Sequence, residues 1–359
     1  PAVSAFRDRF DLLTKELVTL LDSGGFSKRV ADSDFVGQIL NFMGELGIVE
    51  SKVVTLLCGV ASRVHDEAFL RNAKAFQAHF ELEGDGMVTL LGRDSLVKRL
   101  DKANFLSEVV AFMEDEDLRF EKGDVVTFLT DGASSRIGQD AFLNGVKELK
   151  GVFGFNNSHM VTLVGNSGIA SRMVADPEKE KSLVKCVGIV KTGFDFDTSQ
   201  LFTVLSGVAC HLDDPGTLVE NMKRFRDDVG LSKEQLVTAM SSQSVVPNLG
   251  MVEWMEAAKA CKAVVPDFDT FASLLSQDSV ASRLLAEGFA EKLAWVLSLT
   301  ENVARFGGSF WATGMELSKP LVELLMNEYG YRADDLPARN PFWSRIKSKK
   351  DVTELEADL

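Results

Sequence analysis

The sequence predicts an all-α protein, an α-solenoid of about eight helix-turn-helix repeats of about 36 residues with a divergent C-terminal cap. Three observations support this prediction. An apolar block with a central Thr or Ser returns along the chain, a second apolar block with helical spacing follows it, and residues typical of helix ends separate the two. One helical pair cannot bury both of its apolar faces, so neighbouring pairs are expected to stack.

The first block is residues 17–21, with the sequence LVTLL, and it returns at 53–57 as VVTLL. Its Val and Thr content suits a strand, so a repeat of one strand and one helix is the alternative. The apolar run extends over about 12 residues, longer than a strand of such a repeat, which favours a helix. The central positions are Thr19, Thr55, Thr89, Thr127, Thr162, Thr203, Thr238 and Ser273.

The second block places three apolar residues at i, i+4 and i+7, beginning with Phe35, Ile39 and Phe42. This spacing gathers the three side chains on one face of an α-helix, whereas a strand requires a period of two. The first residues of the later copies are Phe69, Phe105, Phe142, Leu183 and Leu218. We therefore expect Phe35, Phe69, Phe105 and Phe142 to occupy equivalent buried sites.

Helix-capping residues separate the blocks. Ser, Thr or Asn is preferred immediately before a helix and Gly immediately after one. The candidates before the first helices are Ser51, Asn157 or Ser158, Thr198 or Ser199, Ser232 and Thr270. The candidates after the second helices are Gly47, Gly154, Gly193 and Gly230.

The pattern weakens toward the C-terminus. All four tryptophans and both tyrosines follow residue 250, as expected where a cap covers the open face of a terminal repeat. We therefore divide the chain into a helical repeat array at 1–300, C-terminal capping helices at 301–336 and an extended charged tail at 337–359.

Composition narrows the class of protein. Apolar residues make up 45% and charged residues 26% of the 359, which is typical of a folded globular protein. Lys and Arg number 39 against 53 Asp and Glu, a net charge of −14, which disfavours nucleic acid as a partner. No stretch approaches a transmembrane segment, and the first 20 residues are too charged for a signal peptide.

Cysteine and histidine usage gives no sign of a cofactor or a metal site. The four cysteines lack CxxC spacing, and the four histidines lie in different repeats without a second ligand nearby. We expect no cofactor, no metal, no catalytic residues and no enzyme activity. Reduced cysteines favour a reducing intracellular compartment, the cytoplasm or an organelle interior.

A basic residue follows most central positions by eight to ten residues. If these side chains were free, the row of basic residues could bind an extended anionic partner. In the structural alternative, each basic residue pairs with a nearby acidic residue. The arginines are Arg29, Arg63, Arg99, Arg136, Arg172 and Arg283. The expected pairs, which we favour over anion binding, include Arg29 with Asp32, Arg63 with Asp66, Arg136 with Asp140, Arg172 with Asp176 and Arg283 with Glu287.

One short segment resembles a known family. Residues 232–237, SKEQLV, are similar to the opening of the helix-turn-helix repeats of transcription-activator-like DNA readers, a resemblance that implies one base read per repeat. The likeness covers one repeat of eight, and the spacing here varies from 34 to 41 residues, which breaks the fixed pitch that base reading requires. We assign no family from it.

The leading hypothesis is a non-catalytic protein-binding scaffold or a structural subunit of a larger assembly, with another protein as its partner. A modular RNA- or DNA-binding repeat protein and an enzyme with an unrecognised site are the alternatives. Aromatic residues are enriched at interface centres. The candidate partner-binding residues are therefore Trp311, Tyr331, Phe342 and Trp343.

Overall fold

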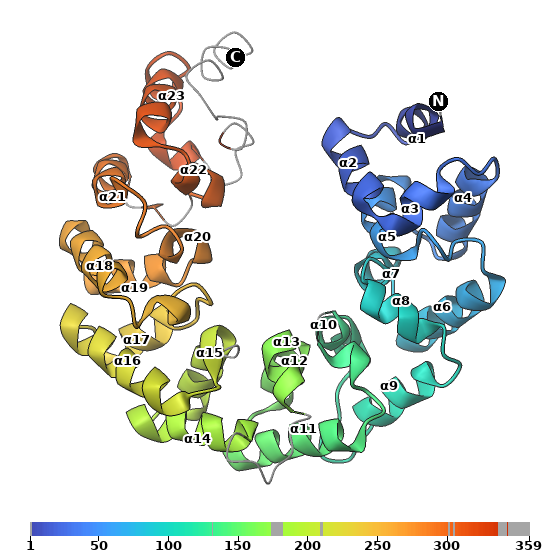
Figure 1. The fold of residues 1–359 in the computed structure, drawn as a ribbon, viewed down its shortest axis with the longest axis horizontal. Helices are drawn as coiled ribbons and strands as arrows, with labels where there is room; N and C mark the ends of the chain where they lie inside the picture. The colour runs from blue at the N-terminus through green and yellow to red at the C-terminus, as the bar shows by residue number, and fades with distance from the viewer. Residues whose placement is uncertain are drawn as a thin grey trace. The chain divides into compact units, whose positions relative to one another are not determined.

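The computed structural model describes residues 2–130, 132–173, 182–208, 211–300, 302–303, 306–336 and 343. These residues form 23 α-helices, several short 3-10 turns and no strand (Figure 1). The prediction of an all-α protein is confirmed, and the described residues contain nothing of the alternative strand-and-helix repeat. The chain divides into two compact parts, an N-terminal part at 1–184 and a C-terminal part at 185–359.

Each copy of the first apolar block lies in a helix, which we call a first helix. Within each part, successive first helices pack on one another, α2 on α5, α5 on α7 and α10 on α12 in the N-terminal part, and α15 on α17 and α17 on α19 in the C-terminal part. The first helices are α2 (Thr14–Asp22), α5 (Val53–Val60), α7 (Gly84–Leu91), α10 (Val125–Leu129), α12 (Asn157–Gly165), α15 (Thr198–Val208), α17 (Lys233–Ala239) and α19 (Phe268–Leu275).

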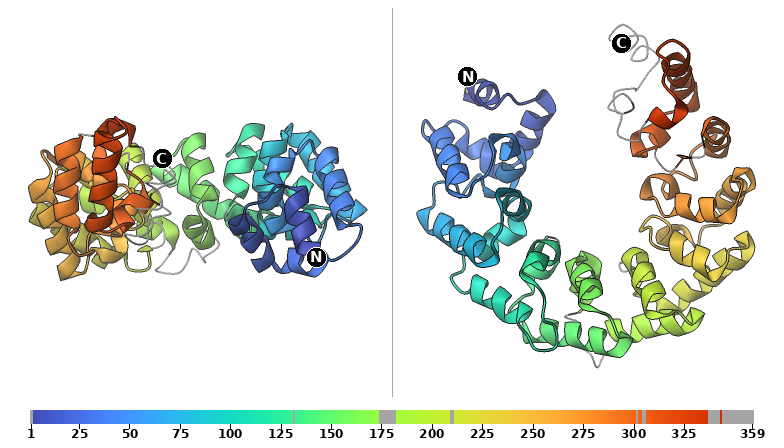
Figure 2. Two further views of the ribbon diagram at one scale, coloured as in Figure 1. Left: turned by 90° about the horizontal axis from the view of Figure 1, so that it is seen from above. Right: turned by 180° about the vertical axis from the view of Figure 1, so that it is seen from behind.

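Each copy of the second block lies in a longer helix, which we call a second helix. Within each part these helices line the side opposite the first helices, as the further views in Figure 2 also show. The second helices are α4 (Phe35–Glu45), α6 (Glu67–Phe80), α9 (Phe105–Met113), α11 (Asp140–Phe153), α14 (Leu183–Phe194), α16 (Pro215–Val229), α18 (Val252–Val264) and α21 (Phe289–Leu299).

The simple helical pair that we predicted is incomplete, because most repeats have a short third element between the first and second helices. Stretches of four to seven residues, such as GGFSKR at Gly24–Arg29, have the composition of turns but fold here as short helices. The intermediate helices are α3 (Gly24–Arg29), α8 (Asp94–Leu100), α13 (Ser167–Arg172) and α20 (Asp278–Ala281), with 3-10 turns at Ala133–Ser135 and Val246–Asn248.

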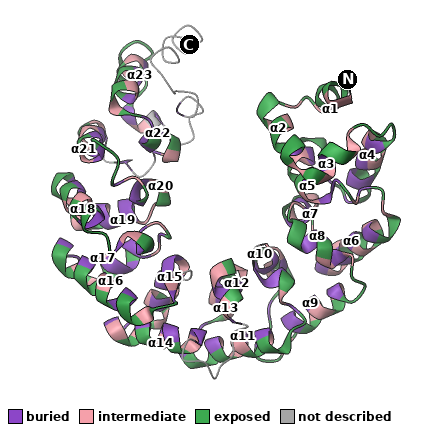
Figure 3. Ribbon diagram, viewed as in Figure 1, coloured by how far each residue is buried: buried purple, intermediate pink, exposed green. Residues whose placement is uncertain are grey.

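Aromatic rings join neighbouring repeats in the N-terminal part. The Phe at i+7 of one second helix stacks on the first Phe of the next, Phe42 on Phe69 at 6.1 Å between centroids. The same contact joins Phe76 to Phe105 and Phe112 to Phe142. The four equivalent Phe positions that we predicted are buried, as are the faces of the helices that meet (Figure 3).

Trp254 continues this pattern in the C-terminal part. It opens the second helix of the seventh repeat, α18, and packs on Phe225 at 5.6 Å between centroids. Ala258 and Cys261 follow at i+4 and i+7, and all three side chains are buried. Trp254 therefore takes part in the contact between successive second helices, inside the range 1–300 that we assigned to the helical array.

The helix ends agree in part with the predicted caps. Ser232 caps α17, and its hydroxyl accepts a hydrogen bond from the Gln235 amide at 3.2 Å. Gly154 and Gly230 follow α11 and α16 in the left-handed conformation, as predicted. Gly193 does not end a helix, because it lies inside α14.

Glycines also set how closely the first helices approach. A Cβ atom on Gly59 of α5 would stand 2.0 Å from the Leu91 carbonyl oxygen of α7. Gly207 of α15 meets the Met240 carbonyl oxygen beside α17 in the same way. Backbone contact of this kind excludes any side chain and fixes the spacing of the repeats.

Three further α-helices complete the described chain: α1 (Ala2–Arg9), α22 (Gly308–Ala312) and α23 (Met315–Asn327). A 3-10 turn at Ala333–Asp335 follows α23. The predicted tail at 337–359 lies outside the described residues except for Trp343. In the described part, no helix is both long and apolar enough to span a membrane.

Candidate functional site

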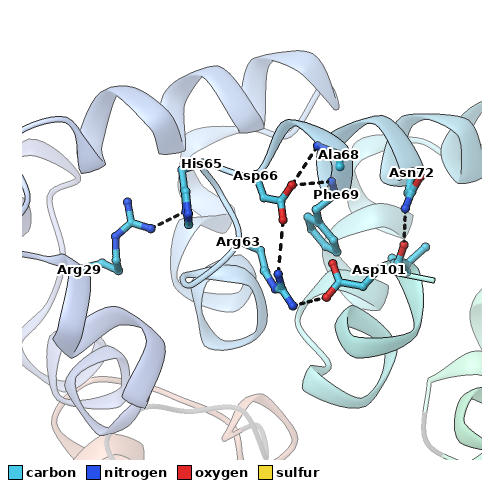
Figure 4. A network of polar contacts seen from close by, with 9 residues as sticks. Arg29, Arg63, His65, Asp66, Ala68, Phe69, Asn72 and Asp101 are labelled. Atoms are coloured by element: carbon cyan, nitrogen blue, oxygen red, sulfur yellow. Dashed lines mark hydrogen bonds and ion pairs between the residues drawn. The ribbon is translucent and has the colours of Figure 1, made fainter. Parts of the chain in front are cut away.

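Arg29 ends α3, and its guanidinium is fully engaged. Its Nε donates to Asp32 Oδ2 at 2.6 Å, and a second nitrogen donates to Gln38 Oε1 at 2.7 Å. The third nitrogen lies 2.6 Å from the Nδ1 atom of His65, which belongs to the next repeat (Figure 4). The Arg29 side chain therefore links two repeats and does not project toward a ligand.

Arg63 makes the same kind of bridge one repeat later. It pairs with Asp66 at 3.4 Å in its own repeat and with Asp101 in the next repeat (Figure 4). Asp66 also caps α6 by accepting from the Phe69 and Ala68 amides at 3.1 and 2.9 Å, and the Phe69 bond is the main reason that its pKa is lowered. The carboxylate thus holds a helix end and an arginine together.

Arg99 repeats the bridge a third time. Its guanidinium donates to Glu108 Oε2 at 2.5 Å and to the Ile137 carbonyl oxygen of the next repeat at 2.7 Å. It also lies over the Phe105 ring, 4.9 Å from the centroid. The three bridges, Arg29 to His65, Arg63 to Asp101 and Arg99 to Ile137, span 36, 38 and 38 residues.

The later arginines depart from the predicted pairs. Within the described residues no ion pair joins Arg136 to Asp140, and Arg283 donates to the Ser279 carbonyl oxygen at 2.9 Å while Glu287 forms no pair with it. The expected Arg172 pair involves Asp176, which lies outside the described residues. Two expected pairs, with Asp32 and Asp66, are confirmed, and two, with Asp140 and Glu287, are wrong.

The candidate aromatic residues divide into buried and exposed. Trp311 is buried, and its indole N–H donates to the Phe306 carbonyl oxygen at 2.8 Å. Trp343 is also buried, edge-on to Phe310 at 4.8 Å between centroids. Tyr331 is 44% exposed, and Phe342 lies outside the described residues. Of the four, Tyr331 has the side chain that the described structure leaves open to a partner.

A groove of about 620 Å³ lies in the C-terminal part, between the end of α18, the start of α19 and the end of α21. Asp267 is one of its lining residues, and it caps α19 by accepting from the Thr270 amide at 2.7 Å and the Thr270 hydroxyl at 2.8 Å. The same two bonds lower the pKa of Asp267, the amide bond most. The groove is lined by Val264, Pro266, Asp267, Thr270, Ala294, Leu297 and Ser298.

The groove combines apolar side chains with polar ones, including the Asp267 carboxylate, and such a mixture is typical of protein-binding surfaces. Val264 is 37% exposed although it is apolar. Its neighbours Pro266 and Leu297 come from other elements of the fold. The sequence gave no signal for the groove, since its lining residues lie up to 34 positions apart, between Val264 and Ser298.

Lys292 in α21 is a buried cation with only 3% of its surface exposed. Its Nζ donates to the Phe310 carbonyl oxygen at 2.5 Å, to the Thr313 carbonyl oxygen and to Ser318 Oγ at 3.0 Å. Burial lowers the pKa of Lys292 to about 7, and the positive charge of Arg283 adds to the effect. The contacts join α21, α22 and α23, so Lys292 has a structural role that sequence reasoning missed.

The remaining polar candidates form local structure. Asn166 caps α13 by accepting from the Gly168 and Ile169 amides at 3.0 and 3.2 Å, so the glycine-rich turn around it is a helix start. Among the described residues, no group of three His, Cys, Asp or Glu side chains is placed to hold a metal ion. Cys186 and Cys261 are buried as free thiols, and burial raises the pKa of Cys261 to about 12.

No known protein family matches this chain, and the comparison with curated proteins finds no match. The case for a function therefore depends on the described surfaces. Two of them matter most: the row of bridging arginines and the groove beside α19.

Proposed function

We propose that this chain is a non-catalytic α-solenoid scaffold that binds another protein. The stacked rings and the contacts between successive first helices support the solenoid, because each repeat covers its neighbour within each part.

The observation that carries the proposal is the internal use of the arginines. The guanidinium groups of Arg29, Arg63 and Arg99 donate hydrogen bonds to acceptors in their own repeat and in the next one. A nucleic-acid reader needs cationic groups that can reach phosphates. With a net charge of −14 as well, a protein is the better partner.

We place the partner-binding site at the groove beside α19. Apolar Val264 and Leu297 would give the buried centre of the interface, and Asp267 would give a polar rim. Tyr331 remains a second candidate contact in the C-terminal part because its ring is exposed.

The test compares groove variants with a matched control in partner capture. The tagged full-length protein is returned to its native source, crosslinked and recovered, and the crosslinked proteins are quantified. Val264→Glu and Leu297→Glu should remove a specific partner, whereas Val152→Glu, at an exposed apolar residue of α11, should retain it. Thermal unfolding of each variant controls for misfolding.

Two results would overturn the proposal. If both groove variants capture the partner as well as the wild type does, the groove is not the binding site. Tight RNA or DNA binding that weakens steeply with salt, with no protein captured, would favour the nucleic-acid alternative.

A further inference from the structure

The C-terminal ends of several second helices lie against basic side chains of the following repeat. A positive charge is favourable there, because the last carbonyl groups of a helix have no intrahelical partner and carry partial negative charge. At three junctions a lysine of the next second helix also pairs with an acidic residue at or close to the helix end. These pairs are Lys74 with Glu45 at 2.5 Å, Lys147 with Asp115 at 2.7 Å and Lys259 with Asp228 at 4.0 Å.

The three lysines hold the same position of the repeat, five residues after the first apolar residue of their helix. The side chain three residues further along lies on the same face of the helix. We call these two places the capping positions. They hold Lys74 and Gln77 in α6, Lys147 and Lys150 in α11, Gly188 and Lys191 in α14, Lys223 and Arg226 in α16, and Lys259 and Lys262 in α18.

Two second helices of the N-terminal part have apolar residues at the capping positions. These are Leu40 and Met43 in α4, and Val110 and Met113 in α9. The end of α6, which α9 follows, is reached from elsewhere, because Lys122 pairs with Glu81, the residue that ends α6, at 2.7 Å. A basic residue is therefore present at this helix end although α9 does not supply it.

The helix α21 departs from the pattern in the C-terminal part. Its capping positions hold Ala294 and Leu297, and both residues line the groove beside α19. The groove is also lined by Val264 and Pro266, at the end of α18. The groove thus occupies the place where earlier repeats put a lysine against the end of the preceding second helix.

No described basic residue of the eighth repeat fills this place. The Arg283 guanidinium donates to the Ser279 carbonyl oxygen at 2.9 Å, and Lys292 is buried among α21, α22 and α23. Lys262 of α18 does not line the groove, and its Nζ lies over the Phe268 ring, 4.1 Å from the centroid. Within the described residues, the end of α18 therefore lacks the lysine contact that the end of α16 receives.

The charge distribution of the groove favours a cation. Val264 is the last residue of α18 and Leu297 lies in the last turn of α21, so the carbonyl ends of two helices lie at the groove. The Asp267 carboxylate accepts from Thr270 and forms no ion pair with any described residue. Apolar walls beside a carboxylate match a lysine, whose stem is apolar and whose ammonium carries three donors.

We propose that the groove beside α19 holds a lysine side chain of the partner protein, an assignment that rests on the function proposed above. The lysine stem packs on Val264, Pro266 and Leu297. Its ammonium donates to the Asp267 carboxylate and to the carbonyl end of α18. The partner thus supplies the side chain that Lys259 supplies within the chain one repeat earlier.

Methyl NMR of the full-length chain tests the lysine site with two small probes. N-acetyl-lysine methylamide and its uncharged analogue N-acetyl-norleucine methylamide are titrated separately while the methyl signals of Val264 and Leu297 are followed. We expect saturable shifts with the lysine probe, and binding about tenfold weaker or worse for the norleucine probe, because a charge-assisted hydrogen bond is lost. Equal binding of the two probes, or no saturable shift with the lysine probe, would overturn the lysine site.

A matched pair of variants separates charge from space. Ala294→Lys places a lysine at the position of Lys259, so it should fill the groove from within the chain and weaken binding of the lysine probe by about tenfold or more. Ala294→Glu adds a side chain of similar size and opposite charge, and should bind the probe about as tightly as the wild type. Equal weakening by the two variants would overturn a charge-based site, and thermal unfolding shows that both are folded.

A third variant tests the carboxylate. Asp267→Asn keeps a side-chain oxygen that can cap α19 but removes the negative charge. It should weaken binding of the lysine probe by about threefold to tenfold and leave binding of the norleucine probe unchanged. Unchanged binding of the lysine probe would overturn the role of Asp267 and with it the proposed site.

Partner capture distinguishes the lysine from the groove itself. Ala294→Lys should lose the partner, and Ala294→Glu should retain it. Loss in both variants would leave the groove as the binding site and overturn the lysine. Retention in both would overturn the groove and the lysine together.

Two further measurements test other sources of the lysine. In the triple variant Lys347→Gln, Lys349→Gln and Lys350→Gln, we expect unchanged probe binding, whereas binding about tenfold tighter would assign the groove to the chain's own C-terminal residues. In sedimentation velocity, a concentration-dependent dimer that Ala294→Lys abolishes would assign the groove to a second copy of the chain. Either result would overturn the lysine of a partner protein.

Discussion

The N-terminal and C-terminal parts join their repeats with different side chains. In the N-terminal part, Phe rings stack between α4 and α6, between α6 and α9 and between α9 and α11, and arginine bridges span 36 to 38 residues. In the C-terminal part, Trp254 replaces the Phe, and the buried Ser242 hydroxyl donates to Asp278 Oδ1 at 2.6 Å across 36 residues. Different side chains therefore make the contacts between neighbouring helices in the two parts.

The backbone contact at the glycines is common to both parts. Gly59 in the N-terminal part and Gly207 in the C-terminal part approach a carbonyl oxygen of the next repeat equally closely. The ring contact uses Phe in the N-terminal part and Trp254 in the C-terminal part. A glycine without room for a Cβ atom has no such substitute.

The ring positions give the largest expected effect. Phe105→Ala in the N-terminal part and Phe225→Ala in the C-terminal part should each lower the free energy of unfolding by roughly 3–5 kcal/mol, because each empties a buried site. Denaturant unfolding followed by far-UV circular dichroism measures both. Near-wild-type stability for either variant would mean that the two junctions are not equivalent.

Lys292 should make the stability of the C-terminal part depend on pH. Its folded-state pKa of about 7 is below its ordinary value of 10.5, so the unfolded chain binds more protons between these values and stability rises with pH. We expect the free energy of unfolding of the wild type, relative to that of Lys292→Met, to increase by on the order of 3 kcal/mol between pH 7 and pH 10. Denaturant unfolding of both proteins at several pH values measures the difference, and a difference independent of pH would contradict the lowered pKa.

Substitution of the close-contact glycines tests what the two parts share. Gly59→Ala and Gly207→Ala should each cost about 1–3 kcal/mol, since the new methyl group meets a backbone oxygen that cannot move away alone. Gly44→Ala in α4 is the matched control, because a Cβ atom there meets nothing within 4 Å and should stabilise the helix by about 0.5–1 kcal/mol. Melting temperatures rank the three, and equal shifts would show that the close contact has no energetic role.

The arginine bridges should have the smallest effect. The Arg63 and Asp101 side chains are 39% and 27% exposed, so a double-mutant cycle should give a coupling of about 0–1 kcal/mol that falls with added salt. Ser242→Ala, which removes a buried hydroxyl from a carboxylate, should cost about 1–2 kcal/mol with little salt dependence. A larger coupling at Arg63 than at Ser242 would reverse the comparison.

Periodic features of the fold were predictable from sequence, because burial of one helix face repeats in the residue pattern. The first and second helices follow from it, as does the buried site of Phe35. The short helix α3 was not predictable, since its Gly-rich sequence has the composition of a turn. Residues 337–359 were predicted as an extended tail, but their removal would take away the buried ring of Trp343.

Contacts between repeats were less predictable. The pair of Arg29 with Asp32 is visible at a spacing of three residues, whereas its contact with His65 depends on how two repeats stack. The groove beside α19 likewise needs three elements to meet, and the burial of Lys292 needs α21, α22 and α23. Sequence periodicity carries no information on such contacts until the packing is known.

The distribution of tryptophan has a consequence for spectroscopy. All four tryptophans follow residue 250, so intrinsic fluorescence reports only on the C-terminal part, with Trp254 buried against Phe225 as a sensitive reporter of one junction. The N-terminal part contains no tryptophan, so its unfolding does not change the tryptophan fluorescence. Its helices do contribute to far-UV circular dichroism. The offset between the fluorescence and dichroism curves would therefore read out, without any label, which of the two parts unfolds first.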